Sequence, residues 1–176
     1  RNDLRCVSIE HKLGINASPT AVMSYGDNDG AVGYLVGEEN EGIKCMFTMM
    51  NNARLAVGLE GVAIAERAYQ QARDYALERV QSRDAASDSA EPVTIVHHPD
   101  VKRMLLSMKS QTEATRAIAY TGAGYLDTAK RHPDADKRAS AQAMVDLLIP
   151  VVKAWSTDIG IEAASTGVQI HGGMGY

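Results

Sequence analysis

The feature that most constrains the fold is a stretch of about 40 residues, from Asn40 to Gln81, that contains no proline. Its apolar residues recur at alternating steps of three and four, which is the spacing of one face of an amphipathic helix. At 1.5 Å per residue such a helix is a rod of roughly 60 Å. Because a rod of this length needs neighbours to cover its apolar face, the sequence predicts a bundle of long helices. The predicted face consists of Ile43, Phe47, Met50, Arg54, Val57, Gly61, Ile64, Ala68, Ala72 and Tyr75.

Two further helices are predicted in the helical domain that we expect over residues 38–176. After a long loop over 82–96, one helix runs over about 99–130 with a proline in its first turn. The other runs from the polar break at 131–134 to about Gln169. Eight Met and only one Phe and one Trp suit closely packed helices better than a β-sandwich. Three long helices suggest a bundle that lacks a member, since four helices are the commoner closed arrangement.

Residues 1–37 have β character and are expected to be the end of a larger β domain, because two or three strands are marginally stable alone. Leu4–Ile9 can form a short strand. Thr20–Tyr25 and Ala31–Val36 are rich in Val, Tyr and Thr, and the turn-forming residues between them predict a hairpin that pairs these two segments. The predicted fold class is therefore mainly α, with a short β remnant before the helices.

Charge and composition exclude several classes of function. The net charge is −4 and there is no basic run, which argues against binding to nucleic acid. No run of about 20 apolar residues is present, so no membrane span is predicted. Cys6, Cys45 and the five His lack the spacing of metal ligands or of a redox motif, so no metal site is predicted. Because the chain starts at Arg1 without Met and stops at Tyr176 after a glycine-rich run, we expect it to be a piece of a longer protein.

Two arginines on the predicted helical face are candidate binding residues. Arg54 stands between Met50 and Val57, where an apolar residue is expected, and Arg79 continues the face one step past Tyr75. They are 25 positions apart, which is roughly 38 Å along a helix axis. A guanidinium that faces a packed seam needs an anion, and phosphates or carboxylates match its geometry. The alternative is that Arg54 pairs with a neighbouring carboxylate and that Arg79 simply ends the helix.

The run Gln169–Gly175 is the second candidate. Adjacent glycines allow a backbone to approach a ligand closely and to direct its amides at a phosphate. The alternative is a helix C-cap followed by a turn, because glycine favours that position. The run is not a dinucleotide-binding fingerprint, since no strand precedes it.

Taken together, several segments of the chain resemble the acyl-CoA dehydrogenase family. Their order and spacing match the family along nearly the whole chain, apart from one insertion. Two shorter segments, Ile9–Lys12 and His98–Val101, are similar to the corresponding segments of the longer bacterial branch that includes 3-methylmercaptopropionyl-CoA dehydrogenases. The segments that carry the family resemblance are Lys12–Thr20, Asn51–Arg54, Tyr75–Arg79 and Gln169–Tyr176.

The resemblance implies an architecture and a reaction. Members of the family have an N-terminal helical domain, a middle β domain and a C-terminal four-helix bundle, and they form homodimers or tetramers with FAD at a subunit interface. A glutamate removes the α proton of an acyl-CoA thioester and a hydride passes from the β carbon to the flavin, which yields a trans-2-enoyl-CoA. An electron-transfer flavoprotein-type acceptor, a role in fatty acid metabolism and a location in the bacterial cytoplasm are implied as well.

The resemblance also implies binding residues. Arg54 matches the family arginine on the CoA-binding and substrate side, and Asn51 stands where relatives usually have Asp, so both are assigned to substrate binding. Arg79 matches the arginine that binds the FAD diphosphate, with Gln81 at a nearby contact. The run that holds FAD from the neighbouring subunit is matched by Gln169, Ile170, His171, Gly172 and Gly173.

Departures from the family pattern also bear on function. Ser82 and Arg83 stand where relatives have Phe-Gly, and Pro99 replaces a glutamine that commonly contacts FAD. The catalytic glutamate of the family is expected beyond Tyr176, and Ala53 occupies the position at which a minority branch carries it. No catalytic residue is therefore assigned, and this chain by itself is predicted not to dehydrogenate an acyl-CoA.

Two other functions are kept as alternatives. An acyl-CoA oxidase shares the helical bundle and differs mainly in the access of oxygen to the flavin. A non-catalytic helical module that only mediates assembly would need no cofactor, and both arginines would then form structural ion pairs.

Overall fold

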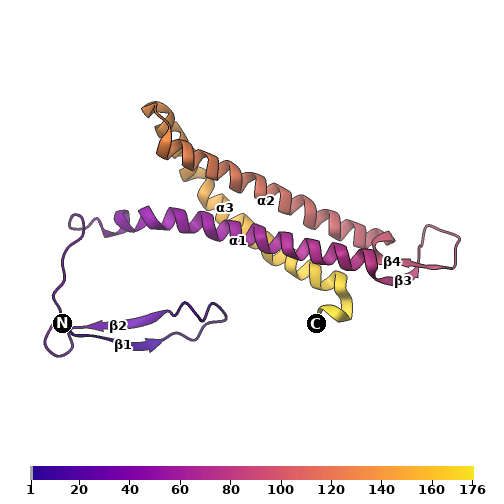
Figure 1. The fold of residues 1–176 in the computed structure, drawn as a ribbon, viewed down its shortest axis with the longest axis horizontal. Coiled ribbons are helices and arrows are strands. Elements are labelled where there is room, and N and C mark those ends of the chain that lie inside the picture. Colours follow the sequence, from indigo (N-terminus) through magenta and orange to yellow (C-terminus); the bar gives the residue numbers. More distant parts are fainter. Residues whose placement is uncertain (1) are drawn as a thin grey trace. The chain divides into compact units, whose positions relative to one another are not determined.

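The computed structural model describes residues 2–176 and is mainly helical, as predicted from the sequence (Figure 1). The chain divides into two compact units, of which one ends at Cys45 and the other is Met46–Tyr176. Within residues 2–176 no helix combines the length and the apolar character needed to cross a membrane. In chain order the elements are β1 (Leu4–Ile9), β2 (Ala21–Tyr25), α1 (Gly42–Glu78), β3 (Val80–Arg83), β4 (Pro92–Thr94), the 3-10 turn η1 (Ile95–His97), α2 (Pro99–Arg131), α3 (Ala135–His171) and the 3-10 turn η2 (Gly172–Gly175).

The first unit contains a small antiparallel sheet of two strands. β1 pairs with β2 so that Leu4 lies opposite Tyr25 and Ile9 lies opposite Ala21. Two of the three predicted strands are therefore formed, and their side chains are almost all exposed. That residues 1–37 end a larger β domain stays a prediction.

The predicted hairpin between 20–25 and 31–36 was wrong, because residues 31–36 form no strand. The turn that precedes this segment is present, with positive φ at Gly26 and Gly30. The chain then passes beside Asn2, whose side-chain amide donates to the Val32 carbonyl at 2.8 Å and accepts from the Val32 N–H at 3.2 Å. The Asn2 side chain thus forms the hydrogen bonds with the Val32 backbone that a neighbouring strand would otherwise form.

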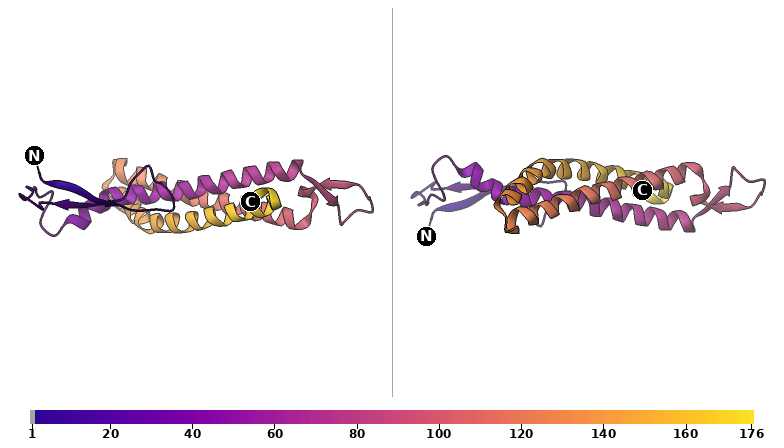
Figure 2. Two further views of the ribbon diagram at one scale, coloured as in Figure 1. Left: turned by 90° about the horizontal axis from the view of Figure 1, so that it is seen from below. Right: turned by 90° about the horizontal axis from the view of Figure 1, so that it is seen from above.

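The second unit is built on three long helices that lie side by side (Figures 1 and 2). α2 runs back along α1, and α3 returns in the direction of α1. The buried side chains form two groups along the bundle, and small residues dominate the contribution of α1. One group contains Ala65, Ala72, Ala76, Ile95, Leu105, Met108, Ile159, Ala163 and Ile170, and the other contains Leu55, Val62, Ala119 and Val152.

The buried face of α1 is displaced by one residue from the predicted face. Ile64, on the predicted face, is 54% exposed, whereas its neighbour Ala65 is fully buried. α1 is apolar over a wide arc, and a step of one residue rotates the face by about 100°. Packing against α2 and α3 selects one part of this arc, which leaves the other part open to solvent.

The starts of α2 and α3 agree with the local sequence signals, whereas α1 ends at Glu78, before the predicted limit at Gln81, and the connection between α1 and α2 differs from the prediction. Pro99 occupies the first position of α2. The Asp134 side chain caps α3 by accepting from the backbone N–H groups of Asp136 and Lys137. The segment over 82–96, predicted as a loop, instead contributes to the hairpin of β3 and β4. This hairpin forms one wall of the site described below.

Candidate functional site

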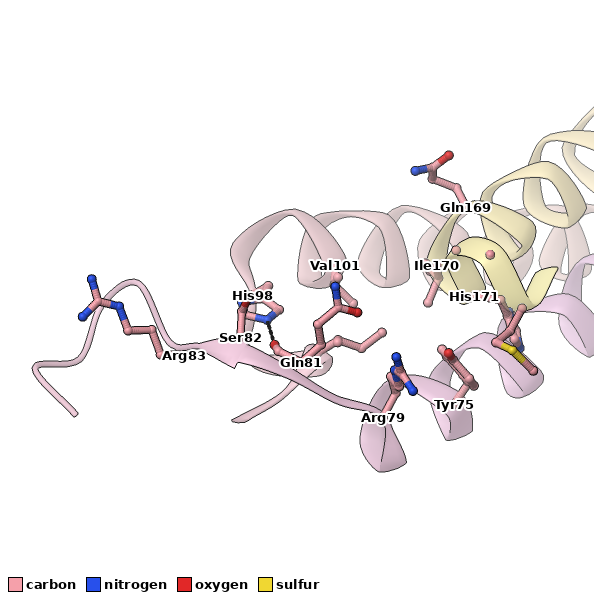
Figure 3. A pocket seen from close by; sticks show the side chains of 14 residues that line it. Tyr75, Arg79, Gln81, Ser82, Arg83, His98, Val101, Gln169, Ile170 and His171 are labelled. Atoms are coloured by element: carbon pink, nitrogen blue, oxygen red, sulfur yellow. Dashed lines mark hydrogen bonds between the residues drawn. The ribbon is translucent and has the colours of Figure 1, made fainter. Parts of the chain in front are cut away.

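A pocket of about 780 Å³ lies at one end of the helical unit, where α1 ends, the β3–β4 hairpin follows, α2 begins and α3 ends (Figure 3). The structure brings together the segment that begins at Arg79 and the segment that begins at Gln169, although their first residues are 90 positions apart in the sequence. All the residues that the sequence assigned to cofactor binding line this pocket, although their role in binding stays a prediction. They are Arg79, Gln81, Gln169, Ile170, His171, Gly172 and Gly173.

The hairpin side of the pocket is held in place by hydrogen bonds to the backbone carbonyls of Arg79 and Gln81. The Ile95 N–H donates to the Arg79 carbonyl at 2.8 Å, directly after the end of α1. His98, just before α2, lies with its Nε2 atom 2.8 Å from the Gln81 carbonyl oxygen. Because a carbonyl only accepts, Nε2 of His98 carries the hydrogen and donates it. These two bonds fix the backbone of Arg79 and Gln81 relative to α2.

The opposite side of the pocket is the end of α3. The Nδ1 atom of His171 donates to the Gly167 carbonyl at 2.7 Å, and the imidazole stacks on Tyr75 of α1 with ring centroids 4.5 Å apart. Gly172 follows with φ +60° and ψ −135°, a conformation that essentially only glycine adopts. Its N–H donates to carbonyls of the last turn of α3, so the C-cap alternative describes Gly172 correctly.

Gly173 differs from Gly172 in what its backbone requires. Its φ is not positive, and a Cβ atom at this position would meet nothing within 4 Å. No contact or backbone angle among residues 2–176 therefore requires glycine at position 173. A ligand that approaches the backbone closely would require it, because a side chain would stand in its way. The C-cap and ligand interpretations of the glycine-rich run are thus compatible, because they apply to different glycines.

The pocket lining is rich in basic groups and contains no carboxylate. Arg79, Arg83, His98 and His171 line it, and no Asp or Glu is among the lining residues. Arg79 is exposed, and no carboxylate oxygen among residues 2–176 comes within 4 Å of its guanidinium. A guanidinium without a counterion in a concave, basic surface attracts phosphate. The ion-pair alternative for Arg79 therefore finds no partner in this part of the chain.

Arg54 and Asn51 lie on the other part of α1 and do not line this pocket. Arg54 is half-buried, and its guanidinium carbon is 5.1 Å from the centre of the Phe47 ring, which is a cation–π contact. The prediction that Arg54 and Arg79 share a buried seam was wrong, since Arg79 is exposed at the end of the helix. The predicted separation of the two arginines along the helix axis, roughly 38 Å, still holds.

Several residues that line the pocket were missed in the sequence. Tyr75 carried a usable signal, because it precedes Arg79 by four positions and such residues share a helical face. His98 also had one, since it immediately precedes the proline that begins α2. Ser82 and Arg83 were noted only as departures from the family pattern, because they lie in a segment predicted as loop and reach the site through the hairpin.

The profile of the acyl-CoA dehydrogenase C-terminal domain matches residues 40–176. A 3-methylmercaptopropionyl-CoA dehydrogenase of Ruegeria pomeroyi is 56% identical over 176 residues, which cover 100% of this chain and 29% of that protein. A butyryl-CoA dehydrogenase of Syntrophomonas wolfei is 35% identical over 180 residues, which cover 99% of this chain and 30% of that protein. The chain thus spans about three tenths of the length of these curated relatives.

Among solved structures, the butyryl-CoA dehydrogenase from Megasphaera elsdenii aligns with a TM-score of 0.73 at 24% identity. The alignment covers 98% of this chain and 39% of that one. This likeness concerns the fold, and it includes the β strands as well as the three helices.

Proposed function

The chain belongs to the acyl-CoA dehydrogenase family, and we propose that it is the helical cofactor-binding part of an FAD-dependent enzyme that converts an acyl-CoA thioester to a trans-2-enoyl-CoA. The observation that carries this proposal is the pocket at the end of the bundle. It combines the Arg79 guanidinium with the backbone at Gly172 and Gly173, and it lacks carboxylates that would repel an anion.

The donor set of the pocket fits the diphosphate of FAD. Arg79 offers a guanidinium without a carboxylate partner among residues 2–176, and Gly173 leaves room for a ligand to approach the backbone. The buried side chain of Ile170 supplies an apolar wall. When bound, FAD would supply the acceptor for the hydride that leaves the β carbon of the substrate. The residues of this chain bind and orient the cofactor by charge and by backbone contact.

We assign the substrate side to the opposite part of α1. Arg54 and Asn51 would bind the CoA portion of the thioester there, as the family resemblance implies. The separation of roughly 38 Å between Arg54 and Arg79 suits two long anionic molecules whose phosphates lie at different ends of one helix. The acyl-CoA class of substrate agrees with the names of the relatives.

The base that removes the α proton is assigned to another part of the complete protein. No Asp or Glu lines the cofactor pocket, and Ala53 stands beside Arg54 where a minority branch of the family has a glutamate. We therefore propose that residues 1–176 by themselves do not dehydrogenate an acyl-CoA.

An open apolar groove supports a role of the bundle in assembly. It has a volume of about 550 Å³ and lies between α1 and α3. Its walls include Ile64, Ile161 and Val168, which are 54%, 72% and 37% exposed. Exposed apolar surface of this kind is typical of a face that another element covers. We propose that a further helix of the complete protein covers it, and that the protein forms a homodimer or tetramer through its bundle.

The full-length protein provides the test. Added FAD should give a protein-bound flavin absorbance near 450 nm, and an acyl-CoA should bleach it. Absence of FAD binding would favour the assembly-module alternative. Rapid reoxidation of the reduced flavin by oxygen would identify an oxidase, and slow reoxidation would indicate a dehydrogenase. A cytoplasmic location remains a prediction.

A further inference from the structure

Tyr75 is a polar residue of the pocket to which neither the sequence nor the proposed function has yet given a role. It is half-buried on α1, four positions before Arg79, and both residues line the pocket. The Arg79 N–H donates to the Tyr75 carbonyl at 2.8 Å, so the helical path continues through Arg79. Residues four apart on such a path lie on the same face. The phenol and the guanidinium are therefore neighbours on one wall.

The Tyr75 ring is held by contacts that do not use its hydroxyl. It stacks on the His171 imidazole with centroids 4.5 Å apart and planes inclined by 26°. His171 in turn is fixed by its hydrogen bond to the Gly167 carbonyl at 2.7 Å. A stack between two anchored rings defines the orientation of Tyr75. This contact also joins the end of α1 to the end of α3.

The hydroxyl of Tyr75 is left available for a ligand. Figure 3 shows the oxygen end of the side chain directed up from α1 into the pocket, and no hydrogen bond joins it to another of the residues drawn there. A phenol hydroxyl is both a donor and an acceptor, and in a pocket it normally finds a partner. Arg79 on the same wall carries a positive charge and can only donate, so the two side chains together favour an anion as that partner.

We propose that Tyr75 is a further cofactor-binding residue, whose hydroxyl donates a hydrogen bond to a phosphoryl oxygen of the diphosphate bound by Arg79. His171 is the positioning residue that holds the phenol in this orientation. The inference rests on the proposed function, because it takes the diphosphate of FAD as the anion. The flavin is not needed for this contact, so ADP, which carries the same diphosphate, is a suitable second probe.

The test is the dissociation constant of FAD, with ADP as a competitor, measured by titration calorimetry on the full-length protein. Tyr75→Phe removes the hydroxyl and keeps the ring stack, and it should weaken both ligands by about tenfold. Tyr120→Phe is the matched control, because Tyr120 lies on α2, is 63% exposed and does not line the pocket. The control should bind both ligands as the wild type does. The ligand-free unfolding midpoint of Tyr75→Phe should equal that of the wild type.

The outcomes separate this inference from the proposed function. Unchanged binding by Tyr75→Phe, together with a loss of binding in Arg79→Gln, would overturn the role of Tyr75 and leave the proposed function standing. Weaker binding by Tyr75→Phe accompanied by a lower ligand-free unfolding midpoint would also overturn it, since the hydroxyl would then be structural. A wild-type protein that binds no FAD would overturn both.

Discussion

Gly61 of α1 lies so close to Ser156 of α3 that a Cβ atom on Gly61 would come within 2.3 Å of the Ser156 carbonyl oxygen. Gly160 faces the same contact, because a Cβ atom there would lie 3.1 Å from the Gly61 carbonyl oxygen. Backbone atoms cannot move aside as the end of a flexible side chain can. The close approach of α1 and α3 therefore depends on the absence of side chains at these positions.

The first prediction concerns this contact. Gly61→Ala should lower the free energy of unfolding by about 1–3 kcal/mol, because the added methyl group forces the helices apart. Gly124→Ala is the matched control, since Gly124 is an exposed helical residue whose Cβ would meet nothing within 4 Å. The control should raise stability by about 0.5–1 kcal/mol through helix propensity. Urea unfolding measures both, and equal effects of the two substitutions would contradict the packing argument.

The second prediction tests the cofactor role of Arg79. Arg79→Gln should weaken FAD binding by about 10- to 100-fold, because a charge-assisted contact to the diphosphate is lost. Arg73→Gln removes an arginine from the same helix that pairs with Asp74 at 2.6 Å and does not line the pocket. Calorimetric titration of the full-length variants with FAD checks the difference. If the two variants bind FAD with equal affinity, Arg79 does not contribute to the cofactor site.

The third prediction separates the two neighbouring glycines at the end of α3. Gly172→Ala should destabilise the fold by about 1–3 kcal/mol, since Gly172 has φ +60° and ψ −135°. Gly173→Ala should leave stability within about 0.5 kcal/mol, because its Cβ would meet nothing within 4 Å. We expect Gly173→Ala to weaken FAD binding nevertheless, as the methyl group obstructs approach to the backbone. Normal FAD binding by Gly173→Ala would restrict the role of the run to capping.

The fourth prediction concerns acid stability. Glu66 of α1 accepts hydrogen bonds from Gln70 and from Arg116 of α2, and these donors lower the pKa of its carboxyl below the ordinary 4.5. A carboxyl that is more acidic in the folded state stabilises the fold above the unfolded pKa, and this contribution is lost as the pH falls through the folded pKa. The contribution is about 1 kcal/mol or less, since the pair is partly exposed.

Glu66→Gln should therefore be less stable than the wild type at pH 7 and should converge with it at acid pH below 4.5. Urea unfolding across this pH range measures the convergence. Glu113→Gln, on the exposed face of α2, should change stability by no more than about 0.5 kcal/mol at pH 7. A constant difference between Glu66→Gln and the wild type at all pH values would show that ionisation of Glu66 does not matter.

The fifth prediction concerns the apolar groove between α1 and α3. Ile161 is 72% exposed in this chain, so Ile161→Glu should change the stability of residues 1–176 by no more than about 0.5 kcal/mol. In the full-length protein the same change would bury a charge, and we expect it to lower the unfolding midpoint or to dissociate the oligomer. Light scattering and thermal unfolding check this. Thr121→Glu, an exposed position on α2 outside the groove, is the control. A full-length Ile161→Glu protein that behaves as the control does would show that the groove stays open.

Much of the site was predictable because its segments carry recognisable motifs. Arg79 and the run from Gln169 were assigned to one cofactor by resemblance alone, and the structure places them in one pocket. Tyr75 could have been added from its spacing to Arg79. Arg83 could not, because its place in the pocket depends on the pairing of β3 with β4. That pairing is a contact between segments with no strong strand pattern of their own.

The sequence by itself determined the class of fold and the starts of α2 and α3. These starts follow from local interactions, namely Pro99 at the first position of α2 and the Asp134 cap of α3. Only the tertiary structure decided which arc of α1 is buried, which strand pairs with β2 and which groups face the pocket. A wide apolar arc is compatible with more than one packing, and the choice of Ala65 over Ile64 depends on the shapes of α2 and α3. The buried arc, the strand pairing and the lining of the pocket all depend on contacts between residues far apart in the chain. The periodicity of a single segment carries no information about such contacts.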